Sequence, residues 1–407
     1  MESFLVVVGA VSGFFWGVLF LVVLVGGGIF LTIRLNFFQI RHLPYIIKQT
    51  FGKLLDKGQG EGTVSPFRAT ATALASTIGA SNIIGVPVAI AYGGPGALLW
   101  MWLTFLVGGA TKFSEVVLGV YYREKNADGH YVGGPGYYMS KGFPIRSVGK
   151  AMARVGVFVA MIYYFPSISM QSISLIQNAE GLGVSKYIAG IVLMVLVGAV
   201  VLGGLSRVSK VADKMVPIMC VLYIGGAFIV LFANIGNVLP SLALVFQSAF
   251  TGTAATGGFI GAGFAMAIRM GIARATYSCE AGMGSAPIAH AAAVTDHPVR
   301  QGLWGVFEVL LDGAVCTLSG IIVLASGVWK EVTPDLATTM PAAAFQKVLG
   351  PAGSYIVTIS IFLFALSSII AVIWYAEKVV EFCLNTRVSK VARVVYTLTI
   401  MLGTVTG

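Results

Sequence analysis

Ten apolar segments, each about as long as a membrane crossing, follow one another along this 407-residue chain. A transmembrane helix needs about 20 predominantly apolar residues. The candidates are 14–33, 68–92, 97–121, 155–176, 187–205, 215–234, 262–293, 303–326, 354–376 and 394–407. Charged residues make up only 10% of the chain, whereas soluble domains carry about 25%. The sequence therefore predicts an all-α protein that lies in a lipid bilayer.

The basic residues gather on one side of this arrangement. If the N-terminus faces outside, 20 of the 26 lysines and arginines fall in cytoplasmic loops and three fall in outer loops. Cytoplasmic loops of membrane proteins carry such an excess of basic residues. The pattern predicts this orientation in a multi-pass protein of the cell membrane. Because the net charge of +10 lies in loops between spans, it does not indicate a nucleic-acid partner.

The first long loop, 37–56, is apolar with regularly placed basic residues. This pattern predicts an amphipathic helix on the inner membrane surface. A loop helix that packs on the protein is the alternative. Elsewhere the sequence shows no metal-ligand spacing and no convincing nucleophile–base pair, so it indicates neither a cofactor nor an enzyme.

Glycine and polar residues interrupt the second span, where Gly79, Ser81, Asn82, Gly85 and Pro87 fall in mid-membrane. Proline in a helix interior costs roughly 3 kcal/mol in water. Backbone groups freed in lipid cost more unless protein, ion or ligand satisfies them. We therefore expect the helix to break where it lines a cavity, although a kink with packing glycines is the alternative.

The seventh span is interrupted in the same way, at Ser278, Cys279, Glu280, Gly282, Gly284, Ser285 and Pro287. An acidic residue at membrane depth is costly to bury, so it is interpreted first as a functional residue. For Glu280 the alternative is a structural ion pair with Arg274. The two breaks lie five spans apart, so each would open one of two repeats, 68–234 and 262–407. Paired interruptions in two halves point to a transporter site.

Four longer stretches resemble one known family. They are GASNIIGVPVAIAYGGPGALLWMW (79–102), KFSEVVLGVYYREKNADGHYVGGPGYYM (112–139), KVADKMVPIMCVLY (210–223) and YSCEAGMGSAPIAHAAAVTDHPVRQG (277–302). They are similar to the alanine/glycine:cation symporters, also called sodium:alanine symporters. The resemblance covers nearly the whole chain.

The resemblance implies a LeuT-type fold, a 5+5 inverted repeat preceded by one extra helix at 14–33. About ten of eleven spans are present, so the expected single transporter domain is incomplete at its C-terminus. The implied function is sodium-coupled symport of a small neutral amino acid, alanine or glycine, into the cell by alternating access. Sodium would be the coupling ion, with no cofactor.

The resemblance also implies a substrate site at the two breaks. The amino acid's carboxylate would meet backbone N–H groups, and its ammonium would meet carbonyls at Tyr277 and Ser278. Tyr277 would cover the substrate and Gln171 would face it, although packing and an interhelical hydrogen bond are the alternatives. The full set is Gly79, Ala80, Ser81, Asn82, Gln171, Tyr277, Ser278, Cys279, Gly282, Met283, Gly284 and Val372.

The implied sodium site combines carbonyls of the first break with two hydroxyls of the ninth span. Its residues are Ser76, Thr77, Gly79, Ser367 and Ser368. A helical serine can instead bond the carbonyl four residues earlier. Three substrate-site residues depart from the family pattern: Ser81 replaces a glycine, Cys279 an asparagine and Val372 a tryptophan. These changes leave the substrate open, because Val372 would enlarge the pocket.

Other ionisable residues leave alternatives open. Lys112 and Glu115, three residues apart, are predicted to pair. His290 is interpreted as a packed or hydrogen-bonded side chain. Proton coupling through Glu280, Asp312 or His290 is the alternative to sodium coupling. A truncated, non-transporting fragment is the other alternative.

Overall fold

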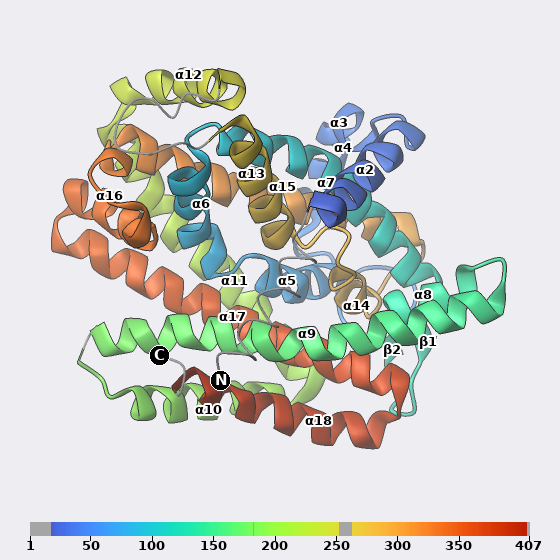
Figure 1. Ribbon diagram of the computed structural model, residues 1–407. Coiled ribbons are helices and arrows are strands. Elements are labelled where there is room, and N and C mark those ends of the chain that lie inside the picture. Colours follow the sequence, from blue (N-terminus) through green and yellow to red (C-terminus); the bar gives the residue numbers. More distant parts are fainter. Residues whose placement is uncertain (1–17, 182, 252–262, 405–407) are drawn as a thin grey trace.

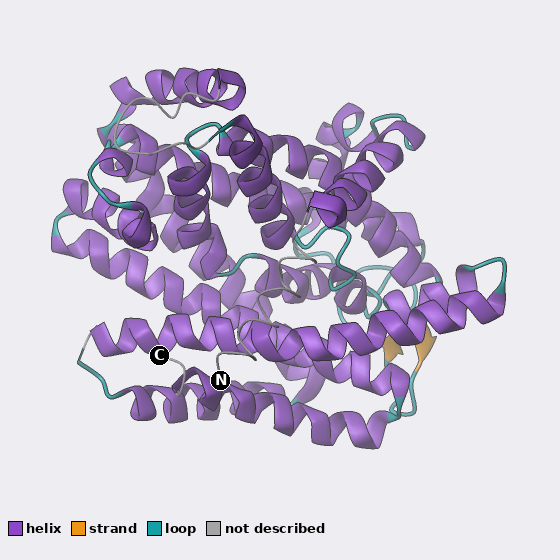
Figure 2. Ribbon diagram, in the orientation of Figure 1, coloured by secondary structure: helices purple, strands orange, loops and turns teal. Residues whose placement is uncertain are grey.

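The computed structural model describes residues 18–181, 183–251 and 263–404, and almost all of these are helical (Figures 1 and 2). Its α-helices are α2 (Val18–Arg34), α3 (Phe38–Arg41), α4 (Leu43–Gln49), α5 (Pro66–Thr77), α6 (Ala80–Gly93), α7 (Ala97–Tyr121), α8 (Pro135–Gly142), α9 (Arg146–Gly181), α10 (Lys186–Val201), α11 (Gly204–Ala233), α12 (Ile235–Thr251), α13 (Phe264–Cys279), α14 (Ala286–His290), α15 (Pro298–Ala325), α16 (Met340–Leu349), α17 (Pro351–Cys383) and α18 (Thr386–Leu398).

Short elements join these helices. The 3₁₀ helices are η1 (Phe51–Lys53), η2 (Val328–Lys330), η3 (Pro334–Thr339) and η4 (Thr399–Thr404). Strands β1 (Glu124–Lys125) and β2 (Tyr131–Val132) form one antiparallel hairpin.

Among the described residues, five helices are long and apolar enough to cross a membrane: α7, α9, α11, α15 and α17. The pair α5–α6 makes a sixth crossing that bends by 41° at its break. Parts of α2, α10 and α12 are shorter apolar helices. These lengths and compositions confirm that the chain passes through the membrane several times.

Several helices begin earlier than the apolar segments predicted. Helix α9 begins at Arg146 rather than 155, α11 at Gly204 rather than 215, and α18 at Thr386 rather than 394. Apolar windows locate only the lipid-buried part of a helix. At α18 the Asn385 side chain accepts hydrogen bonds from the N–H groups of Arg387 and Val388, which fixes the true start.

Two further features differ from what the sequence predicted. Helix α12 lies between two predicted spans and was not anticipated; it runs across one end of the molecule in Figure 1. Segment 37–56 forms three short pieces rather than one helix, because the backbone leaves the helical conformation at His42 (φ −109°, ψ 21°) and again at Thr50. One face packs on the protein through Ile46, which contacts Phe113 and Leu303.

The two interrupted spans lie together in the middle of the molecule. Helix α6 packs along α13, and α5 packs against α14, so the two broken pairs run in opposite directions. Helices α7, α15 and α17 surround them. This antiparallel packing is what an inverted repeat requires, and it brings the two breaks to the same depth.

Candidate functional site

The first break lies at Ile78 and Gly79, where the backbone leaves the helical conformation between α5 and α6. The Gly79 N–H donates a hydrogen bond of 3.0 Å to the Asn82 side chain. First-turn N–H groups of a helix have no carbonyl of their own helix to bond. The N–H groups of Ala80 and Ser81 therefore remain the natural donors for an anion at this end of α6.

Gly79 is the point at which three helices meet. A Cβ built there would lie 2.7 Å from Oγ of Ser368 in α17 and 3.3 Å from Nε2 of Gln171 in α9. Ser368 also donates to the Ser76 carbonyl at 3.3 Å. The fold thus brings Ser76, Gly79, Gln171 and Ser368 together at the first break, and any side chain at Gly79 would push them apart.

In two residues of the implied sodium site, the hydroxyl bonds a group other than those at the first break. The Ser367 hydroxyl donates to the Phe364 carbonyl at 2.8 Å and lies 3.6 Å from the sulfur of Met219, so it faces away from the break. The Thr77 hydroxyl donates to the Ala73 carbonyl of its own helix. Ser368 bonds the Phe364 carbonyl as well, which is the helical alternative raised above. Ser368 alone of the two serines reaches across to α5.

The second break begins after Cys279. Glu280 has a left-handed backbone with φ 51°, a conformation that few residues other than glycine adopt. Its carboxylate accepts hydrogen bonds from the hydroxyls of Ser76, at 2.9 Å, and Ser285. Glu280 therefore joins the end of α5 to the start of α14, and the proposed ion pair with Arg274 is absent from the described residues.

A carboxylate of the protein occupies the amides of the second break. The N–H groups of Gly282 and Gly284 donate to the two oxygens of Glu115 in α7, at 3.1 and 2.9 Å. Both glycines have positive φ, which aims these N–H groups into one concave site. In this structure Gly282 and Gly284 are thus not free to meet a substrate carboxylate, and Met283 lies between them.

The predicted pairing of Lys112 with Glu115 was wrong. Lys112 instead donates to the Cys279 carbonyl at 2.8 Å and lies 3.6 Å from Glu308 of α15. Glu308 also contacts Nε2 of His290 at 2.5 Å, which confirms that His290 is hydrogen-bonded. All three charged or ionisable partners, Lys112, Glu308 and His290, are fully buried.

We expect Lys112→Met to destabilise the protein strongly. Removing one partner of a buried ion pair leaves the other charge uncompensated, at a cost of about 3 to 5 kcal/mol. Thermal unfolding of the purified protein in detergent measures the loss. Adding Glu308→Gln should recover much of it, because the uncompensated charge is then gone. Equal stability of Lys112→Met and the wild type would contradict the ion pair.

A second acidic residue links the two breaks. The Asp312 Oδ1 atom, on α15, accepts hydrogen bonds from the Asn82 amide and, at 2.8 Å, from the Ser278 hydroxyl. Asp312 is fully buried, and its Oδ2 atom has no hydrogen-bond partner among the described residues. Cys316 lies beside the same groups, 3.3 Å from the Ser278 hydroxyl. A carboxylate buried here needs a neighbouring cation if it is ionised, and otherwise it must carry a proton.

The remaining predicted residues lie around this cluster. Tyr277 is half-buried on α13, one residue before Ser278. Val372 is buried on α17, one helical turn from Ser368 and on the same face. Glu115, Glu308 and Arg274 were not recognised as site residues, although charged residues in apolar segments are a signal that the sequence offers.

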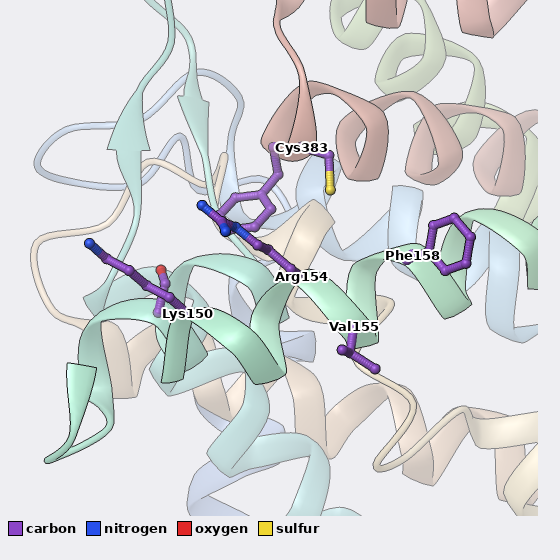
Figure 3. A pocket seen from close by; sticks show the side chains of 7 residues that line it. Lys150, Arg154, Val155, Phe158 and Cys383 are labelled. Atoms are coloured by element: carbon purple, nitrogen blue, oxygen red, sulfur yellow. The ribbon is translucent and has the colours of Figure 1, made fainter. Parts of the chain in front are cut away.

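Two pockets lie beside helices α8, α9 and α17, and one of them reaches the second break. One of about 180 Å³ is lined by Tyr164, the 282–284 segment, and parts of α8 and α17. A larger, open pocket of about 670 Å³ lies between the start of α9 and the end of α17 (Figure 3). Figure 3 shows Lys150 and Arg154 on its α9 wall and Cys383 on α17. No predicted site residue lines this larger pocket, so we place the site at the breaks.

The chain is similar in sequence to known transporters. The sequence profile of the sodium:alanine symporter family matches residues 1–407. The chain is 46% identical to YflA of Bacillus subtilis (strain 168), described as an uncharacterized transporter, over 100% of this chain and 86% of that protein. It is 39% identical to the sodium/alanine symporter AgcS of Methanococcus maripaludis, over 98% of this chain and 88% of that protein.

A solved structure shares the fold. The substrate-bound, outward-open structure of a Na⁺-coupled sialic acid symporter matches 92% of this chain and 80% of that one, with a TM-score of 0.56 and 14% identity. At this identity the likeness shows the fold alone. The sequence matches show that the chain belongs to the sodium:alanine symporter family and is a cation-coupled amino-acid transporter of the membrane, not an enzyme.

Proposed function

We propose that this protein imports a small neutral amino acid, alanine or glycine, together with sodium by alternating access. Gln171 and Ser368 meet the first helix break, which the hydrogen bond from Ser76 to Glu280 joins to the second, and this meeting carries the proposal because it places amide donors, carbonyls and hydroxyls at one buried point. We also propose that the N-terminus faces outside and that the basic loops face the cytoplasm of the cell.

The substrate's carboxylate would bind the N–H groups of Ala80 and Ser81, at the positive end of α6. Its ammonium would bind carbonyls at the end of α13, near Tyr277 and Ser278, where the helix dipole is negative. Gln171 would contact the substrate from α9. Glu115 already accepts hydrogen bonds from the amides of the second break. That break would therefore shape the site rather than bind the substrate's carboxylate.

Val372 and Cys279 bear on which amino acid fits. Val372 is a small wall residue on the α17 face that carries Ser368. Cys279 is fully buried, and its sulfur lies 3.6 Å from a Cβ built on Gly108, so its thiol packs against α7. A small substrate side chain would therefore lie against apolar surface.

The geometry supports a proposal of two cation positions. The first lies at the Ser76 and Gly79 carbonyls beside the Ser368 hydroxyl; these hard, neutral oxygens suit a weakly held, releasable sodium ion. The second is the Oδ2 atom of Asp312, whose buried charge requires compensation. Asp312 also supports the alternative of proton coupling, because a buried carboxylate oxygen without a hydrogen-bond partner among the described residues, here Oδ2, can accept a proton.

Uptake into proteoliposomes tests the function. We expect radiolabelled alanine or glycine to accumulate under an inward sodium gradient and to stop accumulating when choline replaces sodium. An ionophore that dissipates the sodium gradient provides the control. Accumulation driven by a proton gradient without sodium would favour the proton alternative. No accumulation of either amino acid under either gradient would contradict the proposal.

A further inference from the structure

Arg274 lies beside the proposed site, on α13, three residues before Tyr277. A Cβ built on Gly85 of α6 would lie 3.3 Å from Nη1 and 3.7 Å from Cδ of Arg274, and 3.6 Å from Cβ of Ser81. The guanidinium therefore lies against the face of α6 that carries Ser81 and Gly85. The absence of a side chain at Gly85 makes this position possible.

Arg274 forms no salt bridge and no hydrogen bond to another side chain within the described part of the chain; Tyr277, three residues further on, is the ionisable group beside it. Arg274 is half-buried on α13, which packs against α6 and α7. Other arginines of the chain are satisfied: Arg123 donates to four backbone carbonyls, and Arg393 pairs with Glu377. Arginine within a membrane helix is costly and normally faces an anion or a functional cavity.

The charges around the proposed substrate site indicate which anion Arg274 binds. The amides of Gly282 and Gly284 are held by Glu115, so they give no support to a substrate carboxylate. Asp312, bonded to Asn82, adds negative charge beside the first turn of α6. A carboxylate at the Ala80 and Ser81 amides would thus need a nearby positive group, and Arg274 lies about one helical turn away on the same face.

We propose that Arg274 binds the carboxylate of the transported amino acid together with the first-turn amides of α6. This role rests on the proposed function and extends it, because it makes the carboxylate the group by which the protein selects its substrate. A guanidinium offers paired N–H donors that match the two oxygens of a carboxylate. Lysine cannot reproduce that geometry.

The test compares four variants in proteoliposomes under a sodium gradient. Arg274→Gln removes the charge, Arg274→Lys keeps it, and Gly85→Ala displaces the guanidinium without altering it. Arg269→Gln is the matched control, because Arg269 is an exposed arginine on the same helix. Uptake of alanine gives KM and maximal rate, and inhibition by alaninamide, which lacks the carboxylate, gives the selectivity for that group.

We expect Arg274→Gln to raise KM for alanine roughly tenfold or more, since charged hydrogen bonds contribute the most to binding. The preference for alanine over alaninamide should fall by a similar factor. Arg274→Lys and Gly85→Ala should give smaller increases in KM, and Arg269→Gln none. Arg274→Gln with the KM and selectivity of Arg269→Gln would overturn the proposal.

A binding measurement separates this inference from the proposed function. Alanine should raise the melting temperature of the wild-type protein in detergent more than alaninamide does, whether or not uptake occurs. That difference should disappear in Arg274→Gln and persist in Arg269→Gln. If Arg274→Gln does not fold, an unchanged KM in Gly85→Ala overturns the proposal. If the protein binds alanine in an Arg274-dependent way but does not take it up, the result counts against the transport function and not against the role of Arg274.

Discussion

Asp312→Asn is expected to reduce cation-driven uptake at least about 100-fold, which corresponds to roughly 2.7 kcal/mol. Asparagine has nearly the same shape, and its carbonyl can still accept from Asn82 and Ser278. It removes the buried charge that a coupling cation or proton would neutralise. Initial rates of alanine uptake under sodium and proton gradients measure the effect.

The control for this change is Asp335→Asn, the same substitution at an exposed residue of η3. It should leave uptake unchanged. The melting temperature of Asp312→Asn should match or exceed that of the wild type, because a buried ionised group is replaced by a neutral one. Wild-type rates and coupling in Asp312→Asn would show that Asp312 is only a helix contact. Loss of proton dependence with sodium dependence intact would place a proton there.

Changing both Ser367 and Ser368 to alanine is expected to abolish the sodium dependence of uptake. The structure further predicts that Ser368→Ala accounts for most of this loss, because only Ser368 reaches the Ser76 carbonyl. Ser367→Ala is the matched control, since its hydroxyl faces Met219. Uptake measured against sodium concentration should show a large increase in the half-saturating concentration for Ser368→Ala and a small one for Ser367→Ala.

The opposite order of effects would mean that Ser367 turns toward the break when sodium binds. Sodium dependence that survives the double change would refute the assignment of the ion site to these hydroxyls. The two single variants can be compared directly, because both serines also bond the Phe364 carbonyl of their own helix. Loss of that local bond is therefore common to both variants.

The sequence by itself determined that the chain is a helical membrane protein and where its two central helices break. Apolar length and the position of charges act locally, so the breaks at Gly79 and after Cys279 could be predicted without the fold. The motif around Glu280 was specific enough to indicate the family. Helix starts were less predictable: the cap at Asn385 acts outside the apolar segment that was used to find α18.

Only the tertiary structure decided which polar groups meet. Spacing predicted that Lys112 pairs with Glu115 and offered Arg274 as the alternative partner of Glu280, because both pairs are close in sequence. The packed helices instead join Lys112 to Glu308, Glu115 to the amides of the second break, and Glu280 to Ser76. The reason is physical: a buried charge takes the partner that best satisfies it in three dimensions, and that partner lies on another helix.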